Sequence, residues 1–552
     1  MSPTGRSIDL LPAAVVLAPL LAGLMLLGWR IEDRRAAWLA TALASGELVL
    51  TGVMVAAAVP FGLPGPRLEL DLPWVPALGL RLHLGLDGIS APLMLLTALL
   101  TLLVCWHLVR VRPVAGRVRG LLACVLLVEG GAMATFTALD LLLFFVGFEI
   151  VLVPMWFIIA LWGDDSTRST VPPPSAPGPS GAAARRDAAM RFILYTGLGS
   201  AVMLLGLVLV LLRAGTGDLT ALAYRAGAGL SGPVQTTAAV LILLGLAVKA
   251  PMWPLHTWLP PAHTIAPTAG SVLLAGVLLK LGTYGMVRIV VPVLPHGVRV
   301  LAPWLAALGV AGILWGGLAC LVERDLKRLV AMSSVAHLGF VLLGIASLTP
   351  QGLQGALYAN VAHGLITGLL FLVVGALKDR HRSADLTAIG PGLRDRFPRL
   401  GWLLAFGAVA GIGLPGLAGF WGELLVITGA WRGEAALGDL ARPMAVLAGF
   451  GTLLAAAYLL RVLFLVWHGS GDAAPAPAAA AAGPAAASDP AAAAGPAAAA
   501  IVVSTVGDAT SHELAVAGPL VLATLALGLA PWLLLDLTGP VVRGLLAFTG
   551  AP

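Results

Sequence analysis

The sequence predicts an all-α membrane protein that crosses the bilayer many times. Hydrophobic residues make up 59% of the 552 residues and charged residues only 11%, against about 25% in a typical soluble protein. The mean hydropathy is +0.96. Because so few charged side chains cannot cover a surface in water, most of the apolar surface must face lipid. The composition therefore excludes a soluble multidomain enzyme.

Apolar runs of about 20 residues, long enough to cross the hydrocarbon core, recur about fourteen times along the chain. The first run follows only Arg6 and precedes many others, so we interpret it as a retained helix and not as a cleaved signal peptide. The predicted spans are 10–28, 36–58, 88–109, 120–138, 140–162, 192–213, 235–256, 267–290, 300–322, 329–348, 352–377, 401–431, 442–467 and 514–535.

The distribution of basic residues predicts the orientation of these spans. An even number of spans places both termini on one side, and the positive-inside rule selects which side. With the termini outside, the inner loops hold about twice as many lysines and arginines as the outer segments. We therefore expect both termini on the outer, periplasmic side of a bacterial-type plasma membrane. The formal net charge of +6 reflects these inner loops and does not indicate binding to nucleic acid.

The order of the spans suggests an internal repeat. Helices 1–3 occupy residues 1–119, helices 4–8 occupy 120–290, and helices 9–13 occupy 300–467. Since five is odd, two consecutive sets of five helices have opposite orientation. The sequence thus predicts two inverted five-helix repeats after an N-terminal group of three helices.

Each predicted repeat has a helix breaker in its fourth span. Pro251 and Pro254 interrupt one of these spans, and Pro415 and Gly416 interrupt the other. Broken helices at corresponding places in inverted halves indicate a transport site. The alternative is a pair of ordinary proline kinks, which membrane helices tolerate.

Two segments are predicted to lie outside the membrane. Residues 163–187 include the run VPPPSAPGPSG and are expected to form a flexible inner loop. Residues 468–512 are rich in Ala, Pro and Gly, and their prolines exclude a spanning helix. We expect this segment to be a disordered inner linker before the last helix, within 513–552.

The sequence contains no pattern that would bind a metal or a redox cofactor. Cys105, Cys124 and Cys320 occur singly, without a CxxC, so we expect neither a cluster nor a disulfide framework. HxxxH and HExxH patterns, a P-loop and a GxGxxG after a strand are all missing from the sequence. We therefore expect this chain to bind no metal and no redox cofactor.

A few ionisable residues lie within the predicted spans, where a charge costs about 2.5–3.5 kcal/mol at the centre. Glu47 and Arg461 are also intramembrane, without a predicted role. Glu129, His256 and His263 are supporting candidates. The main candidates are Glu149, Lys249, Lys280, His337, His363 and Glu423.

The evidence for a function differs among these residues. Glu149 and Lys249 could equally form one static ion pair that holds two helices together. Lys280 has at least seven apolar residues on its N-terminal side and cannot easily reach water. It must therefore pair with a carboxylate, bind water, or have a lowered proton affinity. His337 or His363 alone is more often a hydrogen-bonded contact between helices.

Taken together, carboxylate, lysine and histidine on successive spans form a row that could pass protons along the membrane plane. Helix breaks free backbone carbonyls and admit the water that such transfer needs. Moving one proton against about 150 mV costs roughly 3.5 kcal/mol. A change in a buried Glu–Lys contact can supply that much, whereas a surface pair cannot.

Six long motifs in this sequence resemble one family, the antiporter-like membrane subunits of respiratory complex I. The likeness is strongest to their M type, also called chain 4, and it covers nearly the whole chain. The motifs are LDGISAPLMLLTALLT at 86–101, FEIVLVPMWF at 148–157, KAPMWPLHTWLP at 249–260, APTAGSVLLAGVLLKLGTYG at 266–285, RDLKRLVAMSSVAHLGFV at 324–341 and GLPGLAGFWGE at 413–423.

The resemblance implies roles for the intramembrane residues. By motif, Glu149 and Lys249 correspond to the family's Glu–Lys pair, and Lys280 corresponds to its central lysine. The two histidines match those near the channel centre. Glu423 matches the terminal carboxylate on the second broken helix, where the M type has glutamate and its sister subunits usually have lysine.

Some residues depart from the family pattern. The loop LPPAHTIAPT has Pro261 and Ile265 where polar residues are common. Trp421 and Ala418 replace a smaller residue and a small polar one in the last motif. These changes affect the expected hydration of the loop and of the exit region, but not the row of lysines.

The resemblance implies a proton-translocating, non-redox subunit of NADH–quinone oxidoreductase. Its partners would be other membrane subunits of complex I, especially neighbouring antiporter-like subunits, together with lipid and protons. NADH, FMN, iron–sulfur clusters and quinone would be bound by other subunits. The alternatives are a subunit of a multi-subunit cation/proton antiporter, a subunit of a membrane-bound hydrogenase, and a pure scaffold.

Overall fold

The computed structural model describes residues 10–58, 65–75, 80–111, 118–164, 181–468 and 507–547. In these residues, thirteen helices are long and apolar enough to cross a membrane. The twelfth predicted span is present as two shorter helices, α20 (Pro398–Ile412) and α21 (Ala418–Trp431). The predicted class, a helical protein with many membrane spans, is therefore confirmed.

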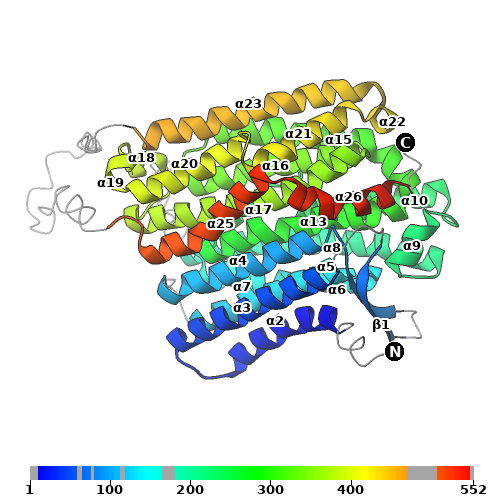
Figure 1. Ribbon diagram of the computed structural model, residues 1–552, viewed down its shortest axis with the longest axis horizontal. Coiled ribbons are helices and arrows are strands. Elements are labelled where there is room, and N and C mark those ends of the chain that lie inside the picture. Colours follow the sequence, from blue (N-terminus) through cyan, green and yellow to red (C-terminus); the bar gives the residue numbers. More distant parts are fainter. Residues whose placement is uncertain are drawn as a thin grey trace, which may run out of the picture.

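The spanning helices run roughly parallel to one another (Figure 1). The first four spans are α2 (Leu11–Gly28), α3 (Asp33–Ala58), α4 (Ala91–Arg110) and α5 (Val118–Thr137). The fifth consists of α6 (Leu141–Ile150) and α7 (Leu152–Trp162). The sixth to eighth are α8 (Gly181–Ala214), α10 (Gly232–Lys249) and the composite helix Thr268–Val293. The others, besides α20 and α21, are α15 (Pro295–Val322), α16 (Leu326–Ala346), α17 (Pro350–His381), α23 (Ala441–Val466) and α25 (Ser511–Leu529).

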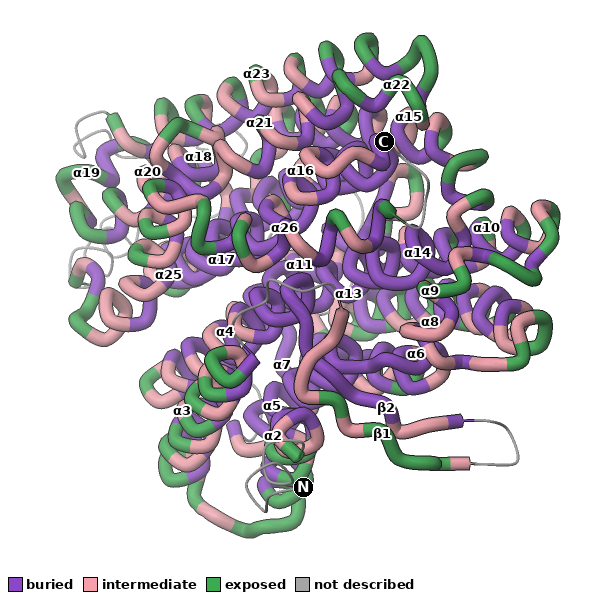
Figure 2. The backbone as a smooth tube through the Cα atoms, turned by 45° about the vertical axis from the view of Figure 1, so that its right-hand side comes forward, coloured by how far each residue is buried: buried purple, intermediate pink, exposed green. Residues whose placement is uncertain are grey.

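Two spans form the centre of the molecule. The most apolar window of Thr268–Val293 and that of α17 are each 100% buried inside the protein, whereas in those of α2, α3 and α23 fewer than half of the residues are buried. Figure 2 shows the buried backbone concentrated around α13 (Leu279–Gly285) and α17. Many exposed side chains on the outer helices are large and apolar, as expected for contact with lipid. The central spans are thus screened from lipid, and they carry Lys280 and His363.

The first helix break lies directly after Lys249. Helix α10 ends at that residue, and the short helix α11 (Leu259–Ile265) begins nine residues after Ala250. The prolines at 251 and 254 cannot donate a backbone hydrogen bond, so the helix cannot continue through them. The indole nitrogen of Trp258 donates to the freed carbonyl of Val248 at 3.0 Å. A lysine at a helix C-terminus is also stabilised by the helix dipole.

The second break separates α20 from α21. Gly413 and Gly416 have φ angles of +79° and +91°, which glycine adopts at low cost. A Cβ atom on Gly413 would lie 2.9 Å from Oε2 of Glu423. The loop therefore requires glycine for two reasons: its backbone conformation, and the close approach of the Glu423 carboxyl.

The span that carries Lys280 contains two π-helical segments. They are η2 (Leu274–Leu278) and η3 (Met286–Val290), and they enclose α13 on both sides. π-Helical turns inside α-helices are rare and frequently occur at functional sites. Here they flank a lysine that is completely buried.

A small β-hairpin is the main element that the sequence analysis did not predict. Strands β1 (Arg67–Val75) and β2 (Leu80–Leu86) pair in antiparallel fashion. The segment alternates polar Arg67, Glu69 and Asp71 with leucines, a period of two that is typical of strands. The hairpin contacts α2 and lies at the end of the molecule where α2 begins (Figure 1).

His83 anchors this hairpin to the helical body. Its two ring nitrogens lie 2.9 Å from carboxylate oxygens of Glu69 on β1 and of Asp218, the N-cap of α9 (Leu219–Arg225). Burial alone would lower the pKa of His83, but the bonds to the two carboxylates outweigh it and raise the pKa to about 9. The same contact holds the pKa of Asp218 below its usual range, despite its partial burial.

We expect the hairpin to loosen at alkaline pH. A histidine whose pKa is raised in the folded state stabilises that state fully below its unfolded pKa of 6.5 and loses this effect as pH rises through about 9. The contribution is about 1–3 kcal/mol, since Glu69 is partly exposed. Hydrogen exchange of residues 67–86 should speed up over this pH window. His83→Gln should exchange fast already at neutral pH, and equal protection in both proteins would contradict the anchor.

Two pairs of aspartates link loops at opposite ends of the molecule. Asp140 and Asp218 form an isolated antiparallel bridge at the hairpin end, and each caps the helix that follows it. Asp325 and Asp385 form the same bridge at the other end, and each again caps a helix. The first pair lies before α6 and between α8 and α10, and the second lies before α16 and between α17 and α20.

An ion cluster lies at the end opposite the hairpin. The carboxylate of Asp164 lies 2.6 Å from the ammonium of Lys378 and 3.3 Å from that of Lys327, which also donates to the carbonyl of Ala266. Burial would raise the pKa of Asp164, but the two lysines outweigh it and hold the pKa below its usual range. This cluster joins α7, α16 and α17.

Several predicted boundaries require correction. Helix α8 begins at Gly181, so residues 181–187 are helical and not part of a flexible loop. Residues 165–180 of that predicted loop and most of the predicted linker at 468–512 lie outside the described residues. After α25, an additional helix α26 (Trp532–Ala547) follows a turn at Ala530.

Candidate functional site

Lys280 and His363 form the core of the site. The ammonium nitrogen of Lys280 lies 2.6 Å from Nδ1 of His363 and 2.5 Å from the carbonyl oxygen of Ala275. Neither an aspartate nor a glutamate pairs with Lys280 among the described residues. A buried lysine without a carboxylate is held by neutral acceptors, which favours exchange of its proton with the histidine.

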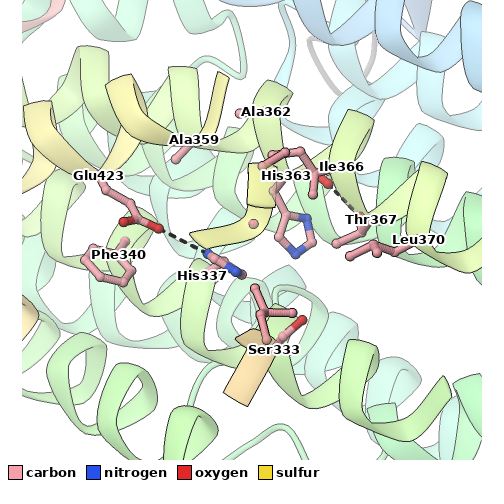
Figure 3. Close-up of a pocket in the computed structure, with 14 residues that line it drawn as sticks. Ser333, His337, Phe340, Ala359, Ala362, His363, Ile366, Thr367, Leu370 and Glu423 are labelled. Atoms are coloured by element: carbon pink, nitrogen blue, oxygen red, sulfur yellow. Dashed lines mark hydrogen bonds and ion pairs between the residues drawn. The ribbon is translucent and has the colours of Figure 1, made fainter. Parts of the chain in front are cut away.

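His363 is followed in space by His337 and Glu423 (Figure 3). The two imidazole rings lie edge to face, with centroids 5.8 Å apart. Nδ1 of His337 lies 3.6 Å from Oε1 of Glu423, and its other nitrogen lies 3.5 Å from the hydroxyl of Tyr458. The spatial order is therefore Lys280, His363, His337, Glu423, although His337 precedes His363 in the sequence.

A cavity connects these side chains. It has room for water of about 30 Å³, and its lining includes His337, His363, Ser333 and Glu423. One water molecule needs roughly 10–15 Å³ by this measure, together with two or more polar partners. The cavity can therefore hold one or two water molecules, and Nε2 of His363 is buried without a protein partner. Water there would bridge the gaps that separate the polar groups.

Glu149 on α6 and Lys249 at the end of α10 interact without direct contact. Lys249 is buried, donates to the carbonyl of Phe148 at 3.4 Å and lies 4.4 Å above the Phe148 ring. Glu149 is close enough to act on the charge of Lys249, but no nitrogen–oxygen distance of 4.0 Å or less joins them. One carboxylate oxygen of Glu149 is buried without a partner. This geometry differs from a closed static ion pair.

The supporting histidines both lie after the first helix break. His263 in α11 is completely buried, stacks on Phe371 with centroids 4.6 Å apart, and has no hydrogen-bond partner on either nitrogen. It lies within electrostatic range of both Lys327 and Lys280. His256 is buried in the turn before α11, and its Nδ1 is also unpartnered.

Glu129 is not part of this row. It lies on α5 and interacts with Glu47 on α3, a residue to which the sequence analysis assigned no role. Both are buried. Among the described residues, no hydrogen bond or ion pair links Glu129 to Lys280, His363 or Glu423, so we assign it to a second group of polar side chains.

Three polar residues near the row escaped sequence analysis. The hydroxyl of Thr283, one turn after Lys280, donates to the side chain of Asn360 at 3.0 Å, which fixes α13 against α17. Tyr458 reaches His337 from α23. An intramembrane Asn or Tyr among apolar residues could have marked these positions, because buried polar groups need partners.

The arrangement consists of side chains that can transfer protons. No group of three or more metal-binding side chains occurs in the part of the chain that the structure describes. Carboxylate, ammonium and imidazole groups can each gain and lose a proton, and histidine does so most readily near neutral pH. The row spans the buried centre of the molecule, between two broken helices.

Comparison with known proteins places the chain in a single group. A family model described as "NADH:quinone oxidoreductase/Mrp antiporter, TM" matches residues 179–449. The chain is 35% identical over 526 residues to "NADH-quinone oxidoreductase subunit M" of Rhodobacter capsulatus, covering 93% of this chain and 91% of that protein. It is 36% identical over 524 residues to "NAD(P)H-quinone oxidoreductase chain 4 1" of a Synechococcus species, covering 94% and 89%.

Solved structures show the same architecture. A chain of respiratory complex I from Thermus thermophilus has a TM-score of 0.79 and 27% identity, with 98% of this chain and 100% of that chain covered. A chain of the Mrp complex from Dietzia sp. has a TM-score of 0.79 at 24% identity, with 98% and 97% covered, and this likeness shows the fold alone.

Proposed function

The chain belongs to the family of NADH:quinone oxidoreductase and Mrp antiporter membrane subunits, and we propose that it moves protons along a row of buried side chains. Its relatives identify it as the subunit M, or chain 4, type of NADH-quinone oxidoreductase. It is thus a proton-translocating part of that enzyme. The row runs from Glu149 and Lys249 through Lys280, His363 and His337 to Glu423.

The contact between Lys280 and His363 carries this proposal. It places a proton donor and acceptor 2.6 Å apart at the buried centre, within hydrogen-bond reach. Beyond it, the cavity beside His337 and Glu423 has room for water. Glu149 and Lys249 are not in direct contact, so the distance between them can change. Closing or separating the two would change the proton affinity of Lys249.

The orientation follows from the inner basic loops. We propose that protons enter from the inside near Glu149 and Lys249, in the first repeat, and leave to the outside beyond Glu423, in the second. The matching aspartate bridges, Asp140–Asp218 and Asp325–Asp385, support the assignment of 120–290 and 300–467 as inverted repeats. They occupy corresponding places in the two segments but lie at opposite ends of the molecule.

Other subunits supply the driving reaction in this proposal. NADH, flavin, iron–sulfur clusters and quinone are bound elsewhere in the complex, which lies in the bacterial plasma membrane. The apolar outer helices meet lipid and neighbouring membrane subunits of the antiporter type. Electron transfer from NADH to quinone then changes the charge or conformation at the row through those neighbours.

Co-purification from native membranes tests which complex contains the chain. The second candidate is a subunit of a multi-subunit cation/proton antiporter, favoured by the fold shared with the Mrp complex. After gentle solubilisation, an affinity-tagged chain should co-purify with NADH-oxidising and quinone-site subunits, identified by mass spectrometry. A tagged unrelated membrane protein is the control. Recovery of small antiporter subunits instead would contradict the assignment to NADH-quinone oxidoreductase.

A further inference from the structure

The N-terminal helices contain a second group of buried ionisable residues, away from the row. Glu47 lies midway along α3 and is 4% exposed, while Glu129 lies midway along α5 and is fully buried. Both helices pack against α4, which contributes Thr101 and Cys105, both fully buried. These three helices therefore enclose two carboxyl groups at mid-membrane depth.

The carboxyl groups have almost no polar partners. Thr51 donates to one oxygen of Glu47 at a long distance of 3.4 Å, and the other oxygen has no partner. Neither oxygen of Glu129 has a hydrogen bond. The hydroxyl of Thr101 on α4 is completely buried and also has no partner among the described residues. The part of the chain that the structure describes therefore supplies no partner for these atoms.

No basic side chain neutralises the pair among the described residues. The segment Leu11–Gly28 of α2, which packs against α5, contains no ionisable residue, and α4 presents only Cys105 at this level. Glu149 lies on α6, which meets α5 at a different face, where Gly131 contacts Ile150. An ionised carboxylate in an apolar interior without a cation is strongly disfavoured, and two adjacent ones are disfavoured more.

We propose that Glu47 and Glu129 form a reversible proton-binding site in which both carboxyls are protonated at neutral pH and release their protons at alkaline pH. Protonation removes the negative charge that this apolar setting, without a cation among the described residues, disfavours. The hydroxyls of Thr51 and Thr101 can donate to a carboxylate or accept from a carboxylic acid, so they serve both states. This site is separate from the proposed path through Lys280, and either proposal can fail alone.

The position of the site gives it a consequence for the row. Gly131 lies two residues after Glu129 on α5. At this glycine α5 contacts α6, at Ile150 next to Glu149. Helices in contact are about 8–10 Å apart, a distance over which charges interact in a protein interior. Loss of the proton on Glu129 would place a negative charge one helix away from the pair formed by Glu149 and Lys249.

Infrared spectroscopy of the purified complex tests the site, because a protonated carboxyl has a C=O stretch that is distinct from that of a carboxylate and shifts in heavy water. The spectrum at neutral pH should lose one protonated carboxyl per chain in Glu129→Gln. In the native complex this band should disappear on alkaline titration. In Glu47→Gln its midpoint should move to lower pH, because the neighbouring carboxylate no longer favours protonation of Glu129.

Ser45→Ala is the matched control, because Ser45 lies on the same helix and bonds only to its own backbone, at Thr41. Its spectrum and midpoint should equal those of the native complex. Three results would overturn the proposal: an unchanged spectrum in Glu129→Gln, an unchanged midpoint in Glu47→Gln, or a carboxyl band that does not titrate while the complex stays intact. None of these results depends on proton transfer through Lys280.

Discussion

Replacing Lys280 with methionine is expected to abolish proton transfer through this subunit. Methionine has a similar length and fills the buried space, but it cannot carry a proton to His363, which lies 2.6 Å from the lysine nitrogen. General acid–base groups typically contribute about 100-fold or more to a rate. The number of protons pumped per NADH should therefore fall, as measured with a pH-sensitive dye in proteoliposomes that contain the purified complex.

The matched control for this substitution is Leu281→Met, at the next position of the same helix and equally buried. It makes a similar change in packing and removes no titratable group, so pumping should remain close to native. Assembly is checked by the subunit content of the purified complex. Native proton stoichiometry in an intact Lys280→Met complex would remove Lys280 from the path.

Replacing Glu423 with glutamine is expected to block the other end of the row. Glutamine preserves the shape of the side chain beside Gly413 and still reaches His337, 3.6 Å away. It cannot exchange a proton with the imidazole or with water in the cavity, so we expect a loss of about 100-fold in proton release. The same proteoliposome assay measures this loss.

Glu434→Gln provides the chemical control for Glu423. Glu434 is also a glutamate, but it is exposed and pairs with Arg442 at the surface, where an ion pair contributes about 0–1 kcal/mol. This variant should pump normally. If Glu423→Gln pumped as well as Glu434→Gln did, the terminal carboxylate would have no role in transfer.

The sequence predicts the helices and their two breaks well, because both depend on local composition. Apolar runs mark the spans, and the proline and glycine residues after Lys249 and Ile412 mark where the helices stop. Lys280 stands out because a lysine in a long apolar run has no local partner. The identity of its partner could not be read in the same way.

The contacts of the row depend on how distant helices pack. His363 and His337 lie on α17 and α16, and their order in space reverses their order in the chain. The open geometry of Glu149 and Lys249 also follows from packing, since Phe148 occupies the space beside the lysine. The π-helical segments around Lys280 have no distinctive composition, because they arise from a shift of backbone hydrogen bonds.

The hairpin and its anchor escaped detection for a different reason. Its strands have an alternating pattern, but they lie between two long apolar spans whose signal dominates the region. His83 and Asp218 are 135 positions apart, and only the tertiary structure brings them together.

We expect the two aspartate bridges to restrain the two halves of the protein, 120–290 and 300–467, at opposite ends. In the first half, Asp140 and Asp218 tie the loops at the hairpin end, so its helices can separate more easily at the opposite end. In the second half, Asp325 and Asp385 tie the opposite end and leave the hairpin end less constrained. With the hairpin outside, the helices of the first half would separate more easily on the side of the cell interior. Those of the second half would separate more easily on the exterior side. If the two segments are inverted repeats, two such bridges at opposite ends would give the protein a direction across the membrane.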